Sequence, residues 1–341
     1  MATIKEVARL AEVSYTTVSH VLNNTRPVSD AARERVIKAV ESLAYVPSAL
    51  ARSLKSNITG TIGLIIPNNT NPYFSEIARG IEDSCYAAGY SVILCNSDDD
   101  PEKQRAYLNM LLTKRCDGLI VAMLGDTDHD LLRKRKVPIV LLDRSRKNAA
   151  VALDIDSVVV DNVAGSVLAA EHLLKIGCKH IACIGGPEEL AIIQARIAGM
   201  RRTIQNAMQK TGKDFPEMHC VYSDFTSAGG YAAASSLLGR SPRPDALFCC
   251  NDLMAIGALR AAAERGISVP EELAVVGFDD IALAQFVHPT LTSVSQHTRQ
   301  LGQLTAQFLL TRIATPNCAL QQKIIMPELH IRGSSVRSDS T

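Results

Sequence analysis

The sequence lacks the patterns that mark secreted and membrane proteins. Its nine cysteines are an odd number and none forms a C-x-x-C pair, so a disulfide framework is not indicated. No apolar stretch approaches the ~18 residues that span a membrane. The first ten residues carry Lys5, Glu6 and Arg9 where a signal peptide needs an apolar segment. We therefore expect a soluble, cytoplasmic protein with reduced, buried thiols, several of them in apolar strand-like runs (Cys95, Cys183, Cys249 and Cys250).

The sequence also lacks the short motifs of several enzyme classes. It contains no G-x-x-x-x-G-K-[ST] phosphate loop, no G-x-S-x-G nucleophile elbow and no H-E-x-x-H zinc motif. Most of its histidines are scattered without the spacing of metal ligands (His129, His172, His180, His219, His288, His297 and His330). We expect neither catalysis, nor a cofactor, nor a metal.

There is also little net charge, which at first disfavours a nucleic-acid partner. The formal net charge of the 341 residues is +1. Residues 1–60, however, hold eight basic and five acidic residues, a net charge of +3, while the remainder holds 28 basic and 30 acidic residues, a net charge of −2. A small basic head on a slightly acidic body favours a phosphate-facing module joined to a domain with another partner.

Residues 3–43 carry the pattern of three short helices. Thr3 and Glu6 form a T-x-x-E capping box at the start of the first helix. Ser14 can cap a second helix over Tyr15–Leu22, and Ser29 a third from about Asp30 to Leu43. Each helix has an apolar face that can pack on the others (Ile4, Val7, Ala8 and Ala11; Val18, Val21 and Leu22; Val36, Ala39, Val40 and Leu43).

The second helix leaves Tyr15, Thr16, Thr17, Ser19 and His20 exposed. Small hydroxyl side chains and one imidazole near a helix start suit the DNA major groove, where they reach phosphates and base edges. The pattern alone is equally consistent with a small helical bundle that has an ordinary polar face.

The order of residues decides between these interpretations. The runs Thr3–Ala8 and Val13–Asn23 resemble the DNA-binding head of the LacI/GalR family of bacterial repressors. The resemblance implies that Tyr15 to His20 form a recognition helix, with Thr16, Thr17 and His20 in the groove. It also implies phosphate contacts from Ser14, Asn23 and Arg26. Glu12 departs from the pattern, because Gly or Asn would relax the backbone more easily at this turn position.

The segment after the head, Tyr45–Ser56, predicts a helix that is not stable alone. Pro47 ends the preceding element and Ser48 can cap a helix of about two turns, which is too short to persist without a partner. The segment resembles the family's hinge helix, which folds when two subunits meet on the operator. In that interpretation Ala49, Leu54 and Lys55 face the minor groove, and Leu54 is wedged into a base step. The alternative is a simple linker with Leu54 packed on the body.

From Thr61 onward, short apolar runs alternate with longer amphipathic ones. We expect strands at Thr61–Ile66, Ser91–Asn96, Gly118–Met123, Pro138–Leu142, His180–Ile184, Ala246–Cys250 and Leu273–Gly277. Helices are expected between them, such as Tyr73–Ala88, Pro101–Lys114, Ala164–Ile176, Ala228–Leu238 and Met254–Arg265. This alternation predicts parallel sheets covered by helices on both faces, and the number of strands favours two doubly wound lobes.

Polar and aromatic side chains follow the strands, where ligands bind in such sheets. Carboxylates, amides and guanidinium groups can bridge vicinal hydroxyls, and aromatic rings offer flat faces to a sugar. Any one of these residues alone is better explained as a turn or cap. Together they resemble the ligand shell of periplasmic ribose-binding proteins, to which the LacI/GalR bodies are related. The resemblance implies sugar contacts from Asn71, Tyr73, Phe74, Asp143, Arg144, Arg196, Phe225, Asn251, Asp279 and Gln296, with Phe278 as a neighbour.

Taken over nearly the whole chain, the resemblance is to ribose-operon repressors. It implies an all-α helix-turn-helix head (residues 1–46), a hinge helix and linker (47–60), and a two-lobed α/β body of the type I periplasmic-binding-protein-like fold (61–341). The N-lobe would take about 61–161 and 291–325, and the C-lobe about 162–290 and 326–335. The chain would thus cross between lobes near Asp161, Pro289–Leu291 and Ile325–Pro327.

The implied function is a homodimeric repressor that leaves operator DNA when ribose or a related pentose binds between the lobes. With no leucine heptad near Thr341, a dimer is preferred to a tetramer. Two alternatives stay open: a purine-type repressor in which the ligand tightens DNA binding, and a transport sugar-binding protein. The second alternative would need an export signal and would not need residues 1–60.

Overall fold

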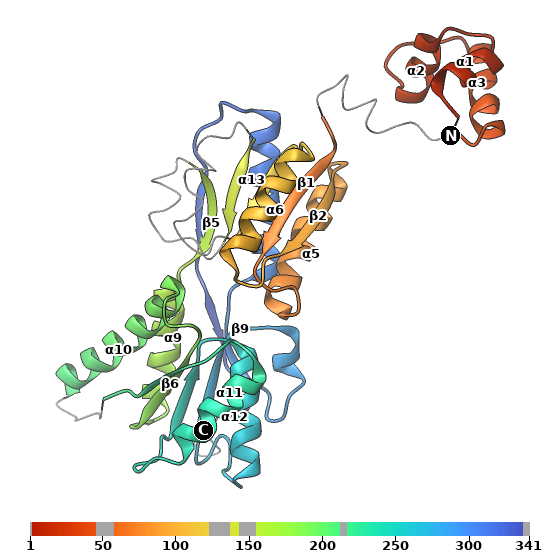
Figure 1. Ribbon diagram of the computed structural model, residues 1–341. Coiled ribbons are helices and arrows are strands. Elements are labelled where there is room, and N and C mark those ends of the chain that lie inside the picture. Colours follow the sequence, from red (N-terminus) through yellow and green to blue (C-terminus); the bar gives the residue numbers. More distant parts are fainter. Residues whose placement is uncertain (1, 46–57, 123–136, 143–154, 212–216, 337–341) are drawn as a thin grey trace. The chain divides into compact units, whose positions relative to one another are not determined.

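The computed structural model describes residues 2–45, 58–122, 137–142, 155–211 and 217–336 of the chain. The chain forms two compact units, Met1–Gly60 and Thr61–Thr341, which Figure 1 draws in sequence colours. The expected hinge residues Ala49, Leu54 and Lys55 and the expected effector residues Asp143 and Arg144 lie outside the described residues. Across the described ranges, no helix has both the length and the apolar character of a membrane span.

The first unit is a bundle of α1 (Ile4–Leu10), α2 (Tyr15–Asn23) and α3 (Asp30–Ser42). The capping box is confirmed, because the Glu6 carboxylate accepts from the Thr3 N–H at 2.7 Å and the Thr3 hydroxyl accepts from the Glu6 N–H at 3.4 Å. Ser29 precedes α3 but makes no side-chain cap hydrogen bond, so the expected cap is wrong there. Asp30 still places a negative charge in the first turn, where it interacts favourably with the helix dipole. The expected apolar faces meet in one core.

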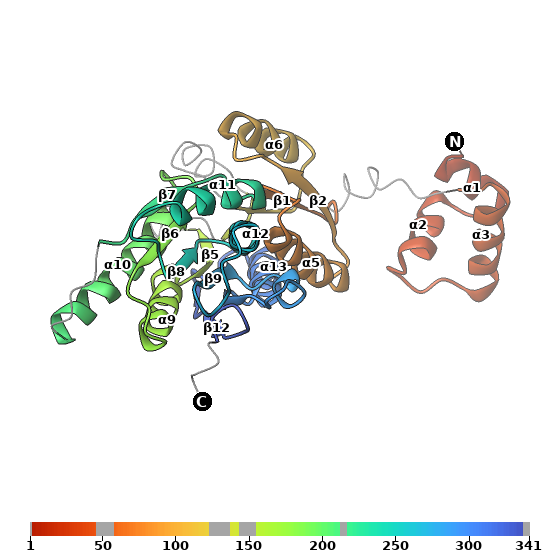
Figure 2. The same cartoon turned by 90° about the horizontal axis from the view of Figure 1, so that it is seen from below.

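The first sheet of the body has six described strands in the order β11-β5-β4-β3-β1-β2, and all neighbours are parallel. Its strands are β1 (Thr61–Ile66), β2 (Ser91–Asn96), β3 (Gly118–Val121), β4 (Ile139–Leu142), β5 (Asp156–Val160) and β11 (Gln322–Ile325). The helices α5 (Pro72–Ala87) and α13 (Thr298–Ala314) pack together against one face, and α6 (Pro101–Thr113) packs against the other (Figure 2). The central strands β1, β3 and β4 are buried almost throughout, which explains their continuous apolar sequences, whereas the edge strands β2 and β11 are partly exposed.

The second sheet has the order β12-β10-β9-β8-β6-β7, in which only the β10–β12 pair is antiparallel. Its strands are β6 (Ile181–Gly185), β7 (Cys220–Tyr222), β8 (Ala246–Cys249), β9 (Ala274–Asp279), β10 (Thr292–Ser295) and β12 (Glu328–His330). The helices α9 (Asn162–Lys175), α10 (Ala191–Thr211), α11 (Ser227–Leu238) and α12 (Asp252–Glu264) cover it. A 3₁₀ turn, η2 (Ala282–Gln285), follows β9. Two doubly wound lobes are therefore confirmed.

The chain passes between the sheets three times, and one expected crossing is wrong. The first passage follows β5 at Asp161, and the third lies between β11 and β12. The second follows Ser295 instead of lying near Pro289–Leu291, because Thr292–Ser295 pairs with β9 in the second sheet. The C-terminal part of the chain then joins the first lobe, where the Arg312 guanidinium of α13 binds both oxygens of Asp156 in β5 at 2.8 and 2.9 Å.

All nine cysteines are free, as expected, but not all are buried. Seven lie in the cores of the lobes, whereas Cys220 and Cys318 are partly exposed. Cys220 is accessible because β7 is the edge strand of the second sheet. The expectation of uniformly buried thiols is therefore wrong for these two residues.

Candidate DNA-binding helix and effector site

The expected recognition helix is α2, and its outer surface is formed by the residues that the sequence indicated. Tyr15 has 64% of its side chain exposed, and Thr16, Asn23 and Arg26 are also exposed. Thr17 and His20 are half-buried. The inward-facing Val18 and Val21 pack against the other helices, so that α2 presents a polar surface from a fixed position.

Several of these polar groups are held by local hydrogen bonds. The Ser14 hydroxyl accepts from the Thr17 N–H at 3.0 Å and lies 2.9 Å from the Thr17 hydroxyl. The His20 Nδ1 lies 2.8 Å from the Thr25 hydroxyl. Glu12, in the turn before α2, has φ +54°, the left-handed conformation that Gly or Asn would adopt more easily. The turn is therefore strained where the sequence indicated it.

In the body, a buried arginine of α10 lies beside a buried aspartate at the end of β9. Arg196 Nη1 lies 3.8 Å from Asp279 Oδ1, and both side chains are at least 95% buried. Arg196 belongs to α10, where its Nε donates to Asn162 Oδ1 at 2.7 Å and its Nη1 donates to the Cys250 carbonyl. Its guanidinium also stacks on the Phe278 ring at 3.7 Å from the ring centre. A buried ion pair is tolerated only when hydrogen bonds satisfy its remaining atoms, as they do here.

Asp279 is also bound from the passage between the lobes. Gln296 Nε2 donates to Asp279 Oδ1 at 2.6 Å, and Gln296 Oε1 accepts from the Tyr73 hydroxyl at 3.3 Å. Tyr73 lies on α5 of the first lobe, so this chain of contacts joins residues of both lobes. Phe74 packs edge-on against Tyr73, with ring centres 4.9 Å apart. Asn71 is nearly buried, and its side chain caps α5 by accepting from the Tyr73 N–H at 3.0 Å.

Phe225 is positioned by its backbone and by a glycine. Its φ of +65° is unusual for an aromatic residue, and its carbonyl accepts from Asn251 Nδ2 at 3.0 Å. The ring lies over Gly186, where an added Cβ would stand 2.3 Å from two ring carbons. Gly186 follows β6, which lies between β7 and β8 in the sheet. The two strands that come next in sequence therefore lie on opposite sides of β6, and doubly wound sheets bind ligands at such a switch point.

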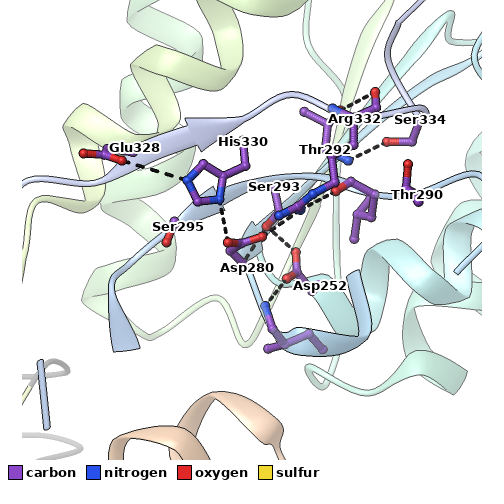
Figure 3. A network of polar contacts seen from close by, with 12 residues as sticks. Asp252, Asp280, Thr290, Thr292, Ser293, Ser295, Glu328, His330, Arg332 and Ser334 are labelled. Atoms are coloured by element: carbon purple, nitrogen blue, oxygen red, sulfur yellow. Dashed lines mark hydrogen bonds and ion pairs between the residues drawn. The ribbon is translucent and has the colours of Figure 1, made fainter. Parts of the chain in front are cut away.

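Behind Asp279, a second network holds the end of β9 (Figure 3). Asp280 contacts His330 Nδ1 of β12 at 2.7 Å and Arg332 Nη1 at 2.7 Å. The Asp280 N–H donates to the Ser293 hydroxyl at 3.1 Å. Asp279 and Asp280 both have positive φ, +115° and +53°. These strained backbone conformations are stabilised by the surrounding hydrogen bonds and ion pairs of the network.

Asp252 lies at the centre of Figure 3 and is fully buried. Its oxygens lie 2.5 Å from the Ser293 hydroxyl and 2.8 Å from the Ile281 N–H, which donates to it. Burial, reinforced by the nearby Asp279, raises the pKa of the Asp252 carboxyl well above its ordinary value. The side chain thus holds the turn after β9 in place.

The structure places one further polar residue and one glycine at this site. Asn162, which binds Arg196, directly follows β5 and its passage to the second lobe. The rule that polar residues follow strands would have found it, had β5 been expected. The role of Gly186 becomes apparent only from its contact with the Phe225 ring. Among the expected effector residues that are described, Arg196, Asp279, Gln296 and Tyr73 form one connected set. Asn71 and Phe74 lie beside Tyr73, and Asn251 binds Phe225.

A helix-turn-helix head joined to two doubly wound lobes defines the class of ligand-responsive DNA-binding proteins. Two family profiles match the chain accordingly. The profile described as "Bacterial regulatory proteins, lacI family" matches residues 3–48, and the profile described as "Periplasmic binding protein-like domain" matches residues 170–335.

Full-length relatives agree with these profiles. The ribose operon repressor of Escherichia coli (strain K12) is 40% identical and covers 98% of this chain and 100% of its own. The HTH-type transcriptional repressor PurR of Photobacterium profundum is 39% identical, with 98% of both chains covered. The chain belongs to the LacI family of DNA-binding transcriptional repressors and is not an enzyme.

Solved structures show the same fold. The lac repressor dimer bound to operator and the anti-inducer ONPF has a TM-score of 0.88 at 28% identity, with 98% of this chain and 99% of that chain covered. A LacI family regulator from Enterococcus faecium with bound ribose has a TM-score of 0.72 at 32% identity, with 81% of this chain and 98% of that chain covered.

Proposed function

We propose that this chain is a homodimeric repressor of a sugar-utilisation operon and that ribose or a related pentose releases it from a palindromic operator. The observation that carries the proposal is the buried Arg196–Asp279–Gln296–Tyr73 network at the strand ends. Adjacent hydroxyls of a pentose can donate to a carboxylate and accept from a guanidinium in pairs. The similarity to a ribose operon repressor and to a ribose-bound regulator supports the same ligand.

The proposed effector contacts combine charged, amide and aromatic groups. Phe225, seated on Gly186, would offer a flat face to the sugar ring, and Asn251 would add an amide beside it. The full proposed set is Asn71, Tyr73, Phe74, Asp143, Arg144, Arg196, Phe225, Asn251, Asp279 and Gln296.

The proposed DNA contacts lie on the head and the hinge. The exposed side of α2 would enter the major groove, and residues around it would bind phosphates. The hinge residues would enter the minor groove, where Leu54 opens a base step and bends the duplex. The proposed set is Ser14, Tyr15, Thr16, Thr17, His20, Asn23, Arg26, Ala49, Leu54 and Lys55.

The proposed coupling follows from the contacts between the lobes. A sugar held by Arg196 and Asp279 in one lobe and by Tyr73 in the other would favour one angle between the lobes. A change of that angle in both subunits would separate the hinges and lower operator affinity. The small charge of the head, +3, leaves one subunit with little non-specific affinity, so that binding would require two heads.

The second candidate is a purine-type repressor, in which the ligand increases operator affinity. The 39% identity to a PurR repressor favours it. The two candidates differ in the sign of coupling, because a ligand that binds the DNA-bound state better must tighten DNA binding.

An operator-binding titration tests both candidates at once. The full-length protein is titrated onto operator DNA selected from random duplexes, without ligand, with ribose, and with hypoxanthine or guanine. The proposal expects ribose to weaken binding at constant salt. Tight binding of a purine together with no calorimetric heat from ribose would contradict it. The Leu54→Ala variant should bind the operator more weakly and ribose equally well, and equal operator binding would remove the hinge assignment.

A further inference from the structure

Three cysteines form a row across adjacent strands of the second sheet. Cys220 of β7 is aligned in register with Cys183 of β6. Cys183 Sγ lies 3.9 Å from the sulfur of Cys250, which directly follows β8. Cys250 is also the residue whose carbonyl accepts from Arg196. The row therefore leads from a partly exposed thiol at the sheet edge to the candidate effector site.

The outer thiol of the row lies beside a positive charge. Arg201 Nη2 of α10 lies 3.5 Å from Cys220 Sγ. The neighbouring Cys183 thiol and the Arg201 guanidinium lower the pKa of Cys220. The neighbouring thiols of Cys220 and Cys250, together with burial, raise the pKa of Cys183 well above its ordinary range. Of the two thiols, Cys220 therefore loses its proton more easily.

The backbone allows these two sulfurs to bond. Aligned residues on neighbouring strands are about 4.7–4.9 Å apart, and disulfides join Cα atoms that are about 4.4–6.8 Å apart. Side chains of aligned residues also point to the same face of a sheet. A bond within this rigid pair would depart from relaxed disulfide geometry, which makes it easier to reduce.

We propose that Cys220 and Cys183 form a reversible oxidation site for hydroperoxides. The Cys220 thiolate attacks the peroxide oxygen, so that an S–O bond forms, the O–O bond breaks and hydroxide leaves. The Cys183 sulfur then attacks Cys220, forming the S–S bond and breaking the S–O bond. The hydroxide that leaves takes the Cys183 proton and becomes water. The two thiols lose two electrons to the peroxide, and a dithiol reductant restores them.

Cys318 provides a matched control. It is the other partly exposed cysteine, and among the described residues its sulfur is bonded by an amide, Gln321 Nε2 at 3.9 Å, instead of by a second thiol. If exposure alone determined oxidation, Cys220 and Cys318 would both be oxidised. The thiol row instead predicts that Cys220 is oxidised in preference to Cys318.

The experiment treats the full-length protein with hydrogen peroxide and counts free thiols by alkylation and intact mass. The expected result is loss of two of the nine alkylated thiols, recovery with dithiothreitol, and a Cys183–Cys220 linkage in the peptide map. Cys220→Ser should abolish the loss, and Cys318→Ser should leave it unchanged. Arg201→Gln should slow it several-fold at neutral pH. Equal thiol loss in Cys220→Ser and in the unsubstituted protein would overturn the proposal.

A second variant identifies the resolving thiol. Because Cys183 is fully buried, Cys183→Ala is first checked for an unchanged unfolding temperature. In this variant the proposal expects Cys220 to stop at the sulfenic acid, which dimedone traps as a stable adduct. If Cys183→Ala fails to fold, the peptide map of the oxidised full chain decides, and a disulfide that lacks Cys183 or Cys220 would overturn the assignment.

Discussion

The Tyr73 hydroxyl donates to Gln296 Oε1 at 3.3 Å, which links α5 of the first lobe to the passage that leaves β10 of the second. Through Gln296 Nε2 the link continues to Asp279, at 2.6 Å. A ligand that binds Asp279 therefore acts on a group already shared by both lobes.

Removal of the Tyr73 hydroxyl tests this link. Tyr73→Phe keeps the buried ring but leaves Gln296 Oε1 without its donor, which removes about 0.5–1.5 kcal/mol of hydrogen bonding. We expect ribose affinity to fall about two- to tenfold, measured by calorimetry. Tyr86→Phe is the control, because Tyr86 lies on the same helix with 76% of its side chain exposed. An equal loss in both variants would show that the Tyr73 contact has no special role.

The seat of the Phe225 ring gives a second prediction. Gly186→Ala would place a methyl group 2.3 Å from two ring carbons, so the ring must move. We expect weaker ribose binding by about tenfold, since a displaced aromatic face loses its contact with the sugar. Gly239→Ala is the matched control, because its Cβ would meet only ordinary contacts at 3.6 Å. Retention of full ribose affinity by Gly186→Ala would remove Phe225 from the site.

The features of the fold that depend on residues close together in the sequence could be predicted. The capping box at Thr3, the buried faces of the three head helices and the strands with continuous apolar runs were all expected. The second crossing was misplaced because Thr292–Ser295 is polar in sequence yet fully buried, paired with β9 and satisfied by contacts such as Ser293–Asp252. Burial of that kind depends on distant partners, which sequence spacing does not reveal.

The candidate site divides in the same way. Asp279 could be expected because it lies at the carboxyl end of the apolar strand β9, whereas Gln296 follows β10, which was not expected, and was named only through the family resemblance. Arg196 could not be placed by that rule, since it lies inside α10 and reaches Asp279 through the fold. The contact of Asn162 with Arg196 and the position of Gly186 under the Phe225 ring depend on segments that are distant in sequence, although the position of Asn162 after β5 is a local signal. The positive φ of Phe225, Asp279 and Asp280 likewise results from tertiary contacts, because none of these residues favours it.

A third prediction concerns the surface of α2. Thr16 is exposed and its side chain makes no hydrogen bond to the described residues, so Thr16→Ala should leave the head folded. If Thr16 contacts a base edge, the variant should lose about 1–3 kcal/mol of operator affinity, with relaxed preference at one base pair. Ser42→Ala removes a hydroxyl from the exposed side of α3 and is the control. The check is a fluorescence-anisotropy titration at fixed salt, and an unchanged Kd for Thr16→Ala would exclude this residue from the interface.

The buried carboxyl of Asp252 gives a prediction of pH dependence. Its pKa is raised by burial in the folded state, so the folded protein retains a proton that the unfolded chain releases at about pH 4. Stability from this group is therefore complete below pH 4. As the pH rises toward the raised pKa, it falls by about 1.4 kcal/mol per pH unit.

The Asp252→Asn variant should lack this loss, since an amide carries no charge, its oxygen can accept from the Ile281 N–H, and its NH₂ group can donate to the Ser293 oxygen in place of the bond that this hydroxyl donates to Asp252. We expect the free energy of unfolding of the variant to match the unsubstituted protein near pH 4 and to exceed it increasingly at higher pH. Denaturant unfolding of the body at several pH values measures this. Asp98→Asn is the control of opposite sign, because the Lys103 ammonium lowers the pKa of the exposed Asp98. A variant that is uniformly less stable at every pH would mean that Asp252 is charged in the folded core.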